Sequence, residues 1–245
     1  MIPDTNYLIP IKLLDTKRMI LQIETATTVC SVALTQDGQV IAYKQIDQRN
    51  IHAEVITVYI DELLESQNLN YKDLDAIAVS CGPGSYTGLR IGVSTAKGLC
   101  FALDKPLIAI ETLEAMAYGV INDAQIINDE MLLCPMIDAR RMEVYTALFN
   151  SEGEQVKATA AEIIDENSFS ELLKKTKILF FGDGADKCIE VLGNNPNAQF
   201  IPHFTNSATH LTQKAAEKFI AKDFVDVAYF EPYYLKDFVA GKKAV

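Results

Sequence analysis

The sequence predicts an α/β fold of two duplicated halves, each with the element order β-β-β-α-β-α, around a cleft. Each half opens with a strand that ends in an acid, Glu24 in the first half and Asp138 in the second. A hairpin signal follows each acid at a similar distance, at 36–38 and at 151–153. The repeat is one of architecture, because residue identity between the halves is slight.

The elements follow from apolar runs separated by turn residues. Short runs rich in β-branched residues indicate strands, and longer stretches with apolar residues every three or four positions indicate helices. The first half is expected to have strands at 19–23, 29–34, 39–46, 76–79 and 107–110, and helices at 53–66, 88–103 and 112–120. The second half is expected to have strands at 132–137, 142–149, 178–181 and 230–235, and helices near 168–175 and from Asn206 or Ser207 to about 221.

Three regions are therefore expected along the chain. Residues 1–18 form an N-terminal extension without the features of a secretory signal peptide. Residues 19–122 form the first half, and residues 123–245 form the second. No run approaches the ~20 apolar residues that a membrane span needs.

The composition is that of a soluble globular protein, with 49% hydrophobic and 22% charged residues over 245 residues. The net charge of −11 argues against a chain that grips nucleic acid alone, because phosphate contacts need clustered Lys and Arg. The pair Arg140 and Arg141 is interpreted as a solvated patch. Five widely spaced cysteines without a C-x-x-C pair favour reduced thiols in the cytoplasm over disulfides or a zinc site.

A glycine-rich turn precedes the helix at 88–103. Ser85 or Thr87 is a suitable N-cap, and the free N–H groups at a helix start attract anions such as phosphate or carboxylate. Gly82, Gly84 and Gly88 are spaced one residue too widely for G-x-G-x-x-G, and no Gly-Lys-Ser/Thr follows. The turn is therefore expected to be an anion site of another kind, and not a Walker A loop.

Two helices carry more apolar surface than packing on one sheet requires. On helix 53–66, Val55 and Val58 widen the main stripe, and on helix 88–103 one side has small residues that would let another backbone approach closely. Either the chain's own core or a partner covers these surfaces. The expected partner interface consists of Ile56, Tyr59, Ile60, Leu63, Gly88, Gly92, Thr95, Ala96 and Leu99.

Glu24 and Asp138 would face each other across the cleft, because both end the first strand of a half. Carboxylates there can hold a hydrated magnesium ion over phosphates, although acids are also common in turns. The triplet at 182–184 could let a nucleotide approach the backbone, or be only a turn. The expected nucleotide- or anion-binding residues are Glu24, Thr25, Thr27, Gly82, Gly84, Ser85, Asp138, Gly182 and Gly184.

The histidines and serines do not form a recognisable catalytic pattern. His52 begins a helix, but the position one turn further on is Ile56, so no metal pair forms on that face. His203 and His210 are not at helical metal spacing. No G-x-S-x-G elbow occurs, and nothing links Ser85 to His52 as part of a triad. We expect no metal ligands and no catalytic residues.

Several segments together resemble the bacterial TsaB (YeaZ) family over about residues 19–240. The run Gly82-Pro83-Gly84-Ser85-Tyr86-Thr87-Gly88-Leu89-Arg90-Ile91-Gly92 is highly specific for it. The other segments are Ile23-Glu24-Thr25-Ala26-Thr27, His52-Ala53-Glu54, Ile137-Asp138-Ala139-Arg140, Glu143-Val144-Tyr145 and Glu231-Pro232-Tyr233-Tyr234-Leu235. One departure is Glu24, where the family usually has Asp.

The resemblance implies an actin-like, sugar-kinase-like ATPase fold with two ribonuclease-H-like halves. It also implies a role in making threonylcarbamoyladenosine at position 37 of tRNAs that read codons beginning with A. In that role the family is a non-catalytic partner of the related TsaD subunit, and the TsaE ATPase joins them. The resemblance implies a TsaD heterodimer through helices 53–66 and 88–103, and tRNA contacts made mainly through partners. Without TsaD, the same apolar surface is expected to pair two copies of this chain.

A second class of function is an enzyme of the same superfamily. A nucleotide-hydrolysing or sugar-kinase-like ATPase would need Glu24, Asp138 and the glycine turns to bind ATP or ADP with magnesium, at a weak or vestigial site. A peptidase would need a metal pair or a triad, neither of which the sequence shows.

Overall fold

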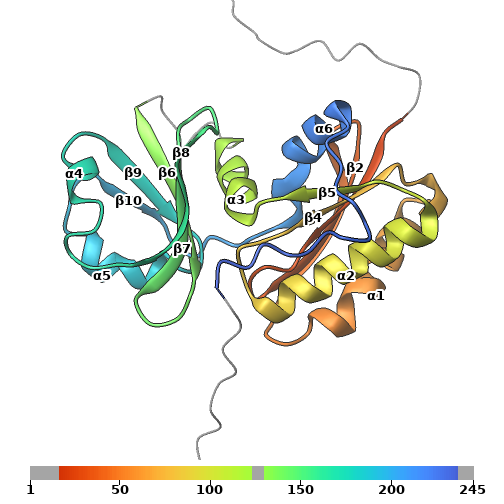
Figure 1. Ribbon diagram of the computed structural model, residues 1–245, viewed down its shortest axis with the longest axis horizontal. Coiled ribbons are helices and arrows are strands. Elements are labelled where there is room, and N and C mark those ends of the chain that lie inside the picture. The colour runs from red at the N-terminus through yellow and green to blue at the C-terminus, as the bar shows by residue number, and fades with distance from the viewer. Residues whose placement is uncertain (1–16, 123–129, 237–245) are drawn as a thin grey trace, which may run out of the picture.

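The computed structural model describes residues 17–122 and 130–236, and these form two mixed β-sheets side by side (Figure 1). The first sheet has the strand order β3-β2-β1-β4-β5, and the second has the order β10-β9-β6-β7-β8. The strands of the first sheet are β1 (Met19–Glu24), β2 (Val29–Gln36), β3 (Gln39–Asp47), β4 (Ala76–Ser80) and β5 (Leu107–Ile110). Those of the second are β6 (Met131–Asp138), β7 (Glu143–Phe149), β8 (Gln155–Ile163), β9 (Lys177–Phe181) and β10 (Ala198–Ile201).

The two sheets repeat one plan of pairing. Strand β1 is antiparallel to β2 and parallel to β4, and β6 is likewise antiparallel to β7 and parallel to β9. On its other side, β4 is parallel to β5, and β9 is likewise parallel to β10. The predicted fold class is therefore confirmed: two similar ribonuclease-H-like α/β halves of the actin-like type.

Helices cover both faces of the first sheet. Helices α1 (His52–Ser66) and α2 (Tyr86–Leu103) pack on one face, and their buried side chains form one core with β1, β2 and β4. Helix α6 (Thr212–Ala221) and the 3₁₀ turn Ala208–Leu211 pack on the other face, where Leu211 and Ala215 contact Ile20 and Ile108.

The second sheet is covered by helix α3 (Thr112–Ile121) on one face and by the short helices α4 (Ser170–Leu173) and α5 (Ile189–Leu192) on the other. Helix α3 follows β5 directly, and Leu113, Met116 and Val120 join the core of the second half. Figure 1 shows α3 between the two sheets.

The predicted halves at 19–122 and 123–245 therefore need correction. Helix α3 packs on the second sheet, whereas residues 206–236 pack on the first. The reason is that each sheet leaves one apolar face open, and an element from beyond its own stretch of chain covers it. The predicted extension at 1–18 lies almost wholly outside the described residues.

Some strand predictions also differ from the structure. The predicted strand at 230–235 is an irregular segment, because Tyr233 N donates to Cys81 O at 2.7 Å and Lys97 Nζ donates to Phe230 O at 2.8 Å. Strand β8, the third of the second half, and the four-residue β10 were not located. Most of β8 is partly or wholly exposed, so its periodicity is weak.

Candidate functional site

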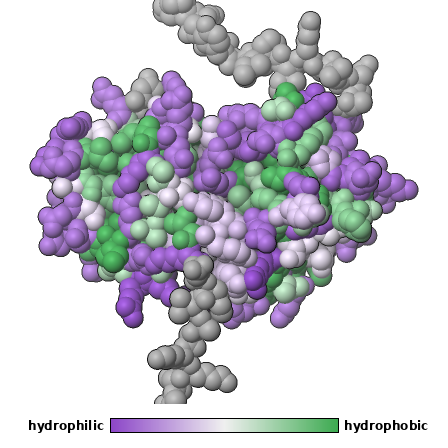
Figure 2. All heavy atoms as spheres, viewed as in Figure 1, coloured by the Kyte–Doolittle hydropathy of each residue, from purple (hydrophilic) through white to green (hydrophobic). Residues whose placement is uncertain are grey.

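A cleft of about 820 Å³ lies between the halves. Its walls come from the turn after β1, the residues before α1, the start of α2, the loop after β6, and the end of the C-terminal segment. Figure 2 shows a pale surface over this junction, neither strongly hydrophobic nor strongly hydrophilic. Four predicted nucleotide-binding residues line the cleft, and these are Thr27, Gly84, Ser85 and Asp138.

Glu24 ends β1 but does not line the cleft. Its side chain is buried, and Glu24 Oε1 accepts a hydrogen bond of 2.6 Å from Ala26 N. Burial raises the pKa of this carboxyl to about 7, because the charged form loses its hydration. The prediction that Glu24 holds magnesium or phosphate is therefore wrong, since its carboxyl group caps its own turn.

Threonines in the same turn are also used within the chain. Thr25 is fully buried, and its hydroxyl donates to Gly88 O at 2.9 Å. The Thr27 hydroxyl accepts from Val29 N at 3.3 Å. His52 Nε2 lies 3.1 Å from Thr27 O, and its ring lines the cleft. The turn forms one wall of the cleft and is held from two sides by hydrogen bonds to α1 and α2.

The glycine-rich turn packs closely on this wall. A Cβ atom at Gly84 would lie 2.5 Å from Ala26 O, and Ser85 N donates to Ala26 O at 2.7 Å. Gly82 N donates to the Thr112 hydroxyl at 3.1 Å, and Gly88 N donates to Ser85 Oγ at 3.3 Å, which confirms Ser85 as the N-cap. Three backbone N–H groups that were expected to bind an anion thus already donate hydrogen bonds within the chain. The glycines instead allow the turn to pack closely against the turn after β1.

The second half presents an open counterpart of this arrangement. Asp138 is exposed, forms an ion pair with Lys187, and its Oδ1 accepts from Arg140 N at 3.0 Å. Asp183 Oδ1 accepts from Asp138 N at 3.0 Å. Gly182 and Gly184 do not line the cleft, since their Cβ positions would lie 2.2 Å from Met136 O and 2.7 Å from the carbonyl carbon of Ile137.

These residues do not fit the phosphates and magnesium ion of a nucleotide in the predicted way. Glu24 is buried on its own turn whereas Asp138 is exposed and paired with Lys187, and several of the expected amides have partners within the chain. No group of three or more His, Cys, Asp or Glu side chains suited to a metal ion occurs within residues 17–122 and 130–236.

The predicted partner interface is mostly buried in the chain's own core. Side chains of Ile56, Ile60 and Leu63 are at most 2% exposed, and Ala96 is fully buried. The remaining buried members, Gly88 and Gly92, approach the turn after β1, not a partner; a Cβ atom at Gly92 would lie 2.2 Å from Thr25 Oγ1. For these six residues the prediction is wrong, because the apolar stripe faces the first sheet.

Three predicted interface residues remain partly accessible. Tyr59, Thr95 and Leu99 are half-buried on the flanks of α1 and α2. Val58 on α1 is 48% exposed, and Phe101 near the end of α2 is 85% exposed. The outer surface of the helix pair thus carries a few exposed apolar side chains among mainly polar ones, and its apolar area is smaller than predicted.

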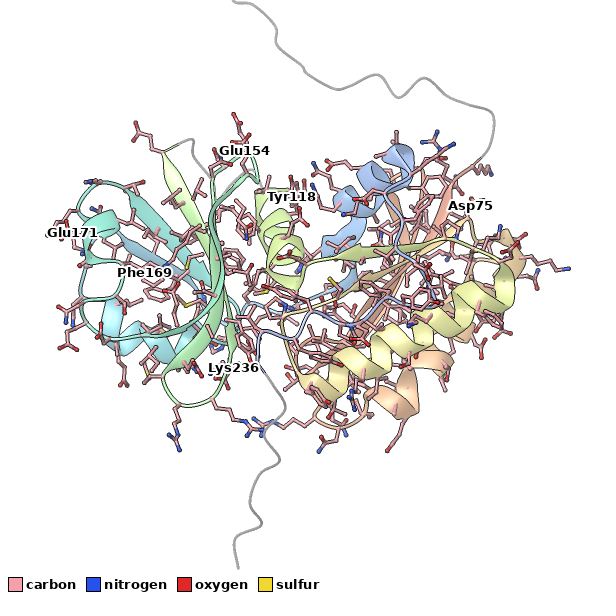
Figure 3. All side chains as sticks on the ribbon, viewed as in Figure 1. Asp75, Tyr118, Glu154, Phe169, Glu171 and Lys236 are labelled. Atoms are coloured by element: carbon pink, nitrogen blue, oxygen red, sulfur yellow. The ribbon has the colours of Figure 1, made fainter. Side chains whose placement is uncertain are left out.

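Sequence reasoning missed the C-terminal wall of the cleft. Tyr234 packs on Tyr86 with ring centroids 4.9 Å apart, and its hydroxyl accepts from Arg90 Nε at 3.3 Å. Lys236 then reaches the second half, where its Nζ lies 2.5 Å from both oxygens of Glu143. Figure 3 shows Lys236 at the lower end of the junction. The sequence predicts a strand at 230–235, and a strand does not indicate that this segment connects the two halves.

Two arginines of the cleft were also not predicted as site residues. Arg49 precedes α1 in the first half, and Arg140 follows β6 in the second. Their position in the sequence could have indicated this role, because both lie in loops next to elements that were predicted to border the cleft.

Comparison with known proteins decides the family. The chain is 31% identical to the tRNA threonylcarbamoyladenosine biosynthesis protein TsaB of Escherichia coli over 246 residues, which cover 91% of this chain and 97% of that protein. The TsaB protein of Haemophilus influenzae is also 31% identical and covers 91% of this chain and 96% of its own length. The chain belongs to the TsaB (YeaZ) family.

Other comparisons agree with TsaB membership. A family model described as TsaD, tRNA N6-adenosine threonylcarbamoyltransferase, matches residues 45–241. The solved structure of YeaZ from Pseudomonas aeruginosa superposes with a TM-score of 0.75 at 25% identity, covering 89% of this chain and all of that one. None of the helices in residues 17–122 and 130–236 is long and apolar enough to cross a bilayer.

Proposed function

We propose that this chain is a non-catalytic subunit of the machinery that makes threonylcarbamoyladenosine at position 37 of tRNA. In this role it pairs with a TsaD-type transferase, activates it, and supports binding of a TsaE-type ATPase. The observation that carries the proposal is the 31% identity with the Escherichia coli TsaB protein over 91% of the chain.

The chemistry of the cleft supports a non-catalytic role. The predicted acid of the first half is buried on its own turn, and His52 Nε2 lies 3.1 Å from two carbonyl oxygens, those of Thr27 and Val29. A hydrolase needs a nucleophile and a base within hydrogen-bond reach, or a metal ion with open coordination. An ATPase or peptidase is therefore the less supported alternative.

The exposed surface of α1 and α2 is the proposed site of pairing. Gly98 lies on α2, and among residues 17–122 and 130–236 no atom outside its own helix comes within 4 Å of the position of its Cβ. A glycine inside a helix costs about 1 kcal/mol relative to alanine. The chain's own packing does not require this glycine, whereas close approach of a partner's backbone would. Without that partner, the same surface would pair two copies of this chain.

Reconstitution tests the proposed function directly. The purified chain is mixed with the TsaD and TsaE proteins of its source, an unmodified tRNA and the threonylcarbamoyl donor. Modified adenosine is then counted by mass spectrometry of the nucleosides. We expect strong modification only when this chain is present. Equal modification without it, or modification by this chain alone, would refute the proposal.

A matched pair of variants tests the pairing surface. Val58→Asp places a charge on the outer face of α1, and Val156→Asp does the same on β8 of the second half, where the side chain is 55% exposed. Burial of an unpaired charge should weaken binding of the TsaD protein by about tenfold or more, roughly 1.4 kcal/mol, for Val58→Asp alone. Titration calorimetry measures the affinity of each variant for the TsaD protein. If Val58→Asp and Val156→Asp bind it equally well, the interface lies elsewhere.

The ATPase alternative has its own simple test. A ligand that binds the native state raises the melting temperature in a saturable way. We expect no saturable shift with magnesium and ATP for the isolated chain, because the expected phosphate-binding groups have internal partners. A saturable shift would revive nucleotide binding.

A further inference from the structure

The cleft contains two of the three arginine side chains that have no partner among the described residues; the third, Arg141, is exposed and does not line the cleft. Of the chain's five arginines, Arg18 lies over the ring of Phe219, and Arg90 contacts Tyr86 and Tyr234. Arg49 and Arg140 line the cleft from opposite halves. Within residues 17–122 and 130–236, neither guanidinium group has a hydrogen bond, an ion pair or a ring contact. Two unpaired cations thus flank one cavity in a chain of net charge −11.

The turn that carries Arg140 is strained. Arg140 has φ of 73° and Arg141 has φ of 51°, a left-handed region that disfavours residues with a Cβ atom. Asp138 Oδ1 accepts from Arg140 N at 3.0 Å, and Ala139 N donates to Glu143 O at 3.1 Å, so the conformation is held on both sides. Glycine or asparagine would suit these positions better. Strain of this kind is commonly retained where the side chain has a function.

The acids of the cleft do not cancel these arginines. Asp138 is paired with Lys187, and the carboxylate of Asp183 accepts from the backbone of Asp138. Lys236 in turn is paired with Glu143. Asp183 keeps its negative charge, but within the described residues neither arginine forms an ion pair with it or with Asp138. The planar forks of the two guanidinium groups match phosphate oxygens.

The cleft also offers aromatic surface beside these cations. Tyr145 on β7 lines it and is half-buried, and Tyr86 and Tyr234 form the opposite, stacked wall. Proteins bind single-stranded nucleic acid by combining a cationic groove with aromatic side chains on which bases stack. RNA recognition favours loops, whose unstacked bases can reach such side chains. The cleft volume of about 820 Å³ lies within the range of pockets that enclose a ligand of small-molecule size.

We propose that this cleft binds a single-stranded segment of the tRNA substrate, with phosphates held by Arg49 and Arg140 and a base beside Tyr145. The inference rests on the proposed function, which supplies the RNA. It departs from the expectation that tRNA is contacted mainly through partners. Because the phosphates are held by side chains, the tightly packed glycine turn is not needed for binding.

Three variants test the inference in the reconstituted complex. Arg49→Gln and Arg140→Gly remove one cleft cation each, and Arg140→Gly also relieves the left-handed strain. Lys222→Gly is the matched control, because Lys222 is an exposed cation with φ of 56° at the end of α6. Affinity for a fluorescently labelled unmodified tRNA is measured by anisotropy over a series of salt concentrations.

Each cleft variant should lower the affinity about threefold to tenfold and reduce the slope of log K against log salt by roughly 0.7, the value for one single-strand phosphate contact. The control should leave both unchanged. Arg140→Gly should also raise the melting temperature of the isolated chain, so a weaker affinity would not reflect unfolding. Unchanged affinity and slope in both cleft variants would overturn the inference.

Other outcomes identify a different occupant and would equally overturn it. One is loss of the TsaD protein, and not of tRNA, from the variant complexes. Another is a thermal shift with ATP that disappears in the variants while tRNA affinity persists. The proposed function is scored separately, by modified adenosine at saturating tRNA. There the wild-type chain and the Lys222→Gly control should support full modification whatever the cleft variants do, so failure of one proposal is distinguishable from failure of the other.

Discussion

The ends of β1 and β6 occupy the same place in the two halves but differ in what they present. After β1, the carboxyl group of Glu24 is buried on the N–H of Ala26, and the glycine-rich turn packs on that turn. After β6, Asp138 is exposed beside Lys187, and the loop that follows carries Arg140 into the cleft. In this duplicated fold, the turn after β1 is thus used for packing within the chain, whereas the loop after β6 is open to contact with a ligand. The position of a strand end predicts neither outcome.

The largest expected effect concerns the two glycines that follow the parallel strands β4 and β9. Gly82 has φ of 120° and Gly182 has φ of 107°. A Cβ atom would lie 2.4 Å from Tyr233 O at the first and 2.2 Å from Met136 O at the second. Gly182→Ala should destabilise by about 4 kcal/mol and Gly82→Ala by about 2 kcal/mol, because Met136 belongs to the central strand β6 whereas Tyr233 belongs to an irregular segment outside the sheets.

Urea unfolding of both variants checks this order. If Gly82→Ala proved the more damaging, the C-terminal segment would be as firmly held as a central strand, and the contrast between the walls would be weaker than stated.

The next largest effect is the pH dependence of the contribution that Glu24 makes to stability. Burial raises the pKa of Glu24 from 4.5 to about 7, so between these values the folded chain retains a proton that the unfolded chain has lost. This contribution to stability is complete below pH 4.5 and is lost as the pH rises to about 7, a change of about 3 kcal/mol. The side chain in Glu24→Gln cannot ionise. The free energy of unfolding of this variant should therefore rise relative to that of the wild type by about 3 kcal/mol between pH 4.5 and about 7.

The difference between variant and wild type is the quantity to measure, by urea unfolding from pH 5 to 8. The wild-type profile alone is less informative, because burial lowers the pKa of His210 to about 4 and this acts in the opposite direction. A difference that stays constant with pH would mean that Glu24 is hydrated, and that the first wall is as open as the second.

The smallest effect concerns the exposed acid. Asp138 and Lys187 form a partly exposed ion pair, with side chains 46% and 24% accessible. Such pairs contribute less than about 1 kcal/mol. Asp138→Asn should therefore change the free energy of unfolding only slightly, and less so at high salt. A loss of several kcal/mol would show that Asp138, like Glu24, supports the fold.

Much of the fold could be predicted because its signals are local. Strand β1 begins at Met19 as expected, the hairpin at Asp37-Gly38 has the positive φ values its residues favour, and Ser85 caps α2. The site could be predicted only in part. Thr27, Ser85 and Asp138 do line the cleft, but sequence reasoning could not tell that Glu24, one residue from the turn, is buried.

The sequence by itself determined the duplicated element order, the chain's family and the location of the glycine-rich turn, because these depend on residue types and spacing along the chain. Only the tertiary structure decided which side of α1 and α2 faces inward, that α3 and α6 each cover a sheet from the other half's stretch of chain, and that Arg49 and Arg140 share a cavity. Those outcomes depend on contacts between residues far apart in sequence, where burial and close packing, and not local preference, select the arrangement.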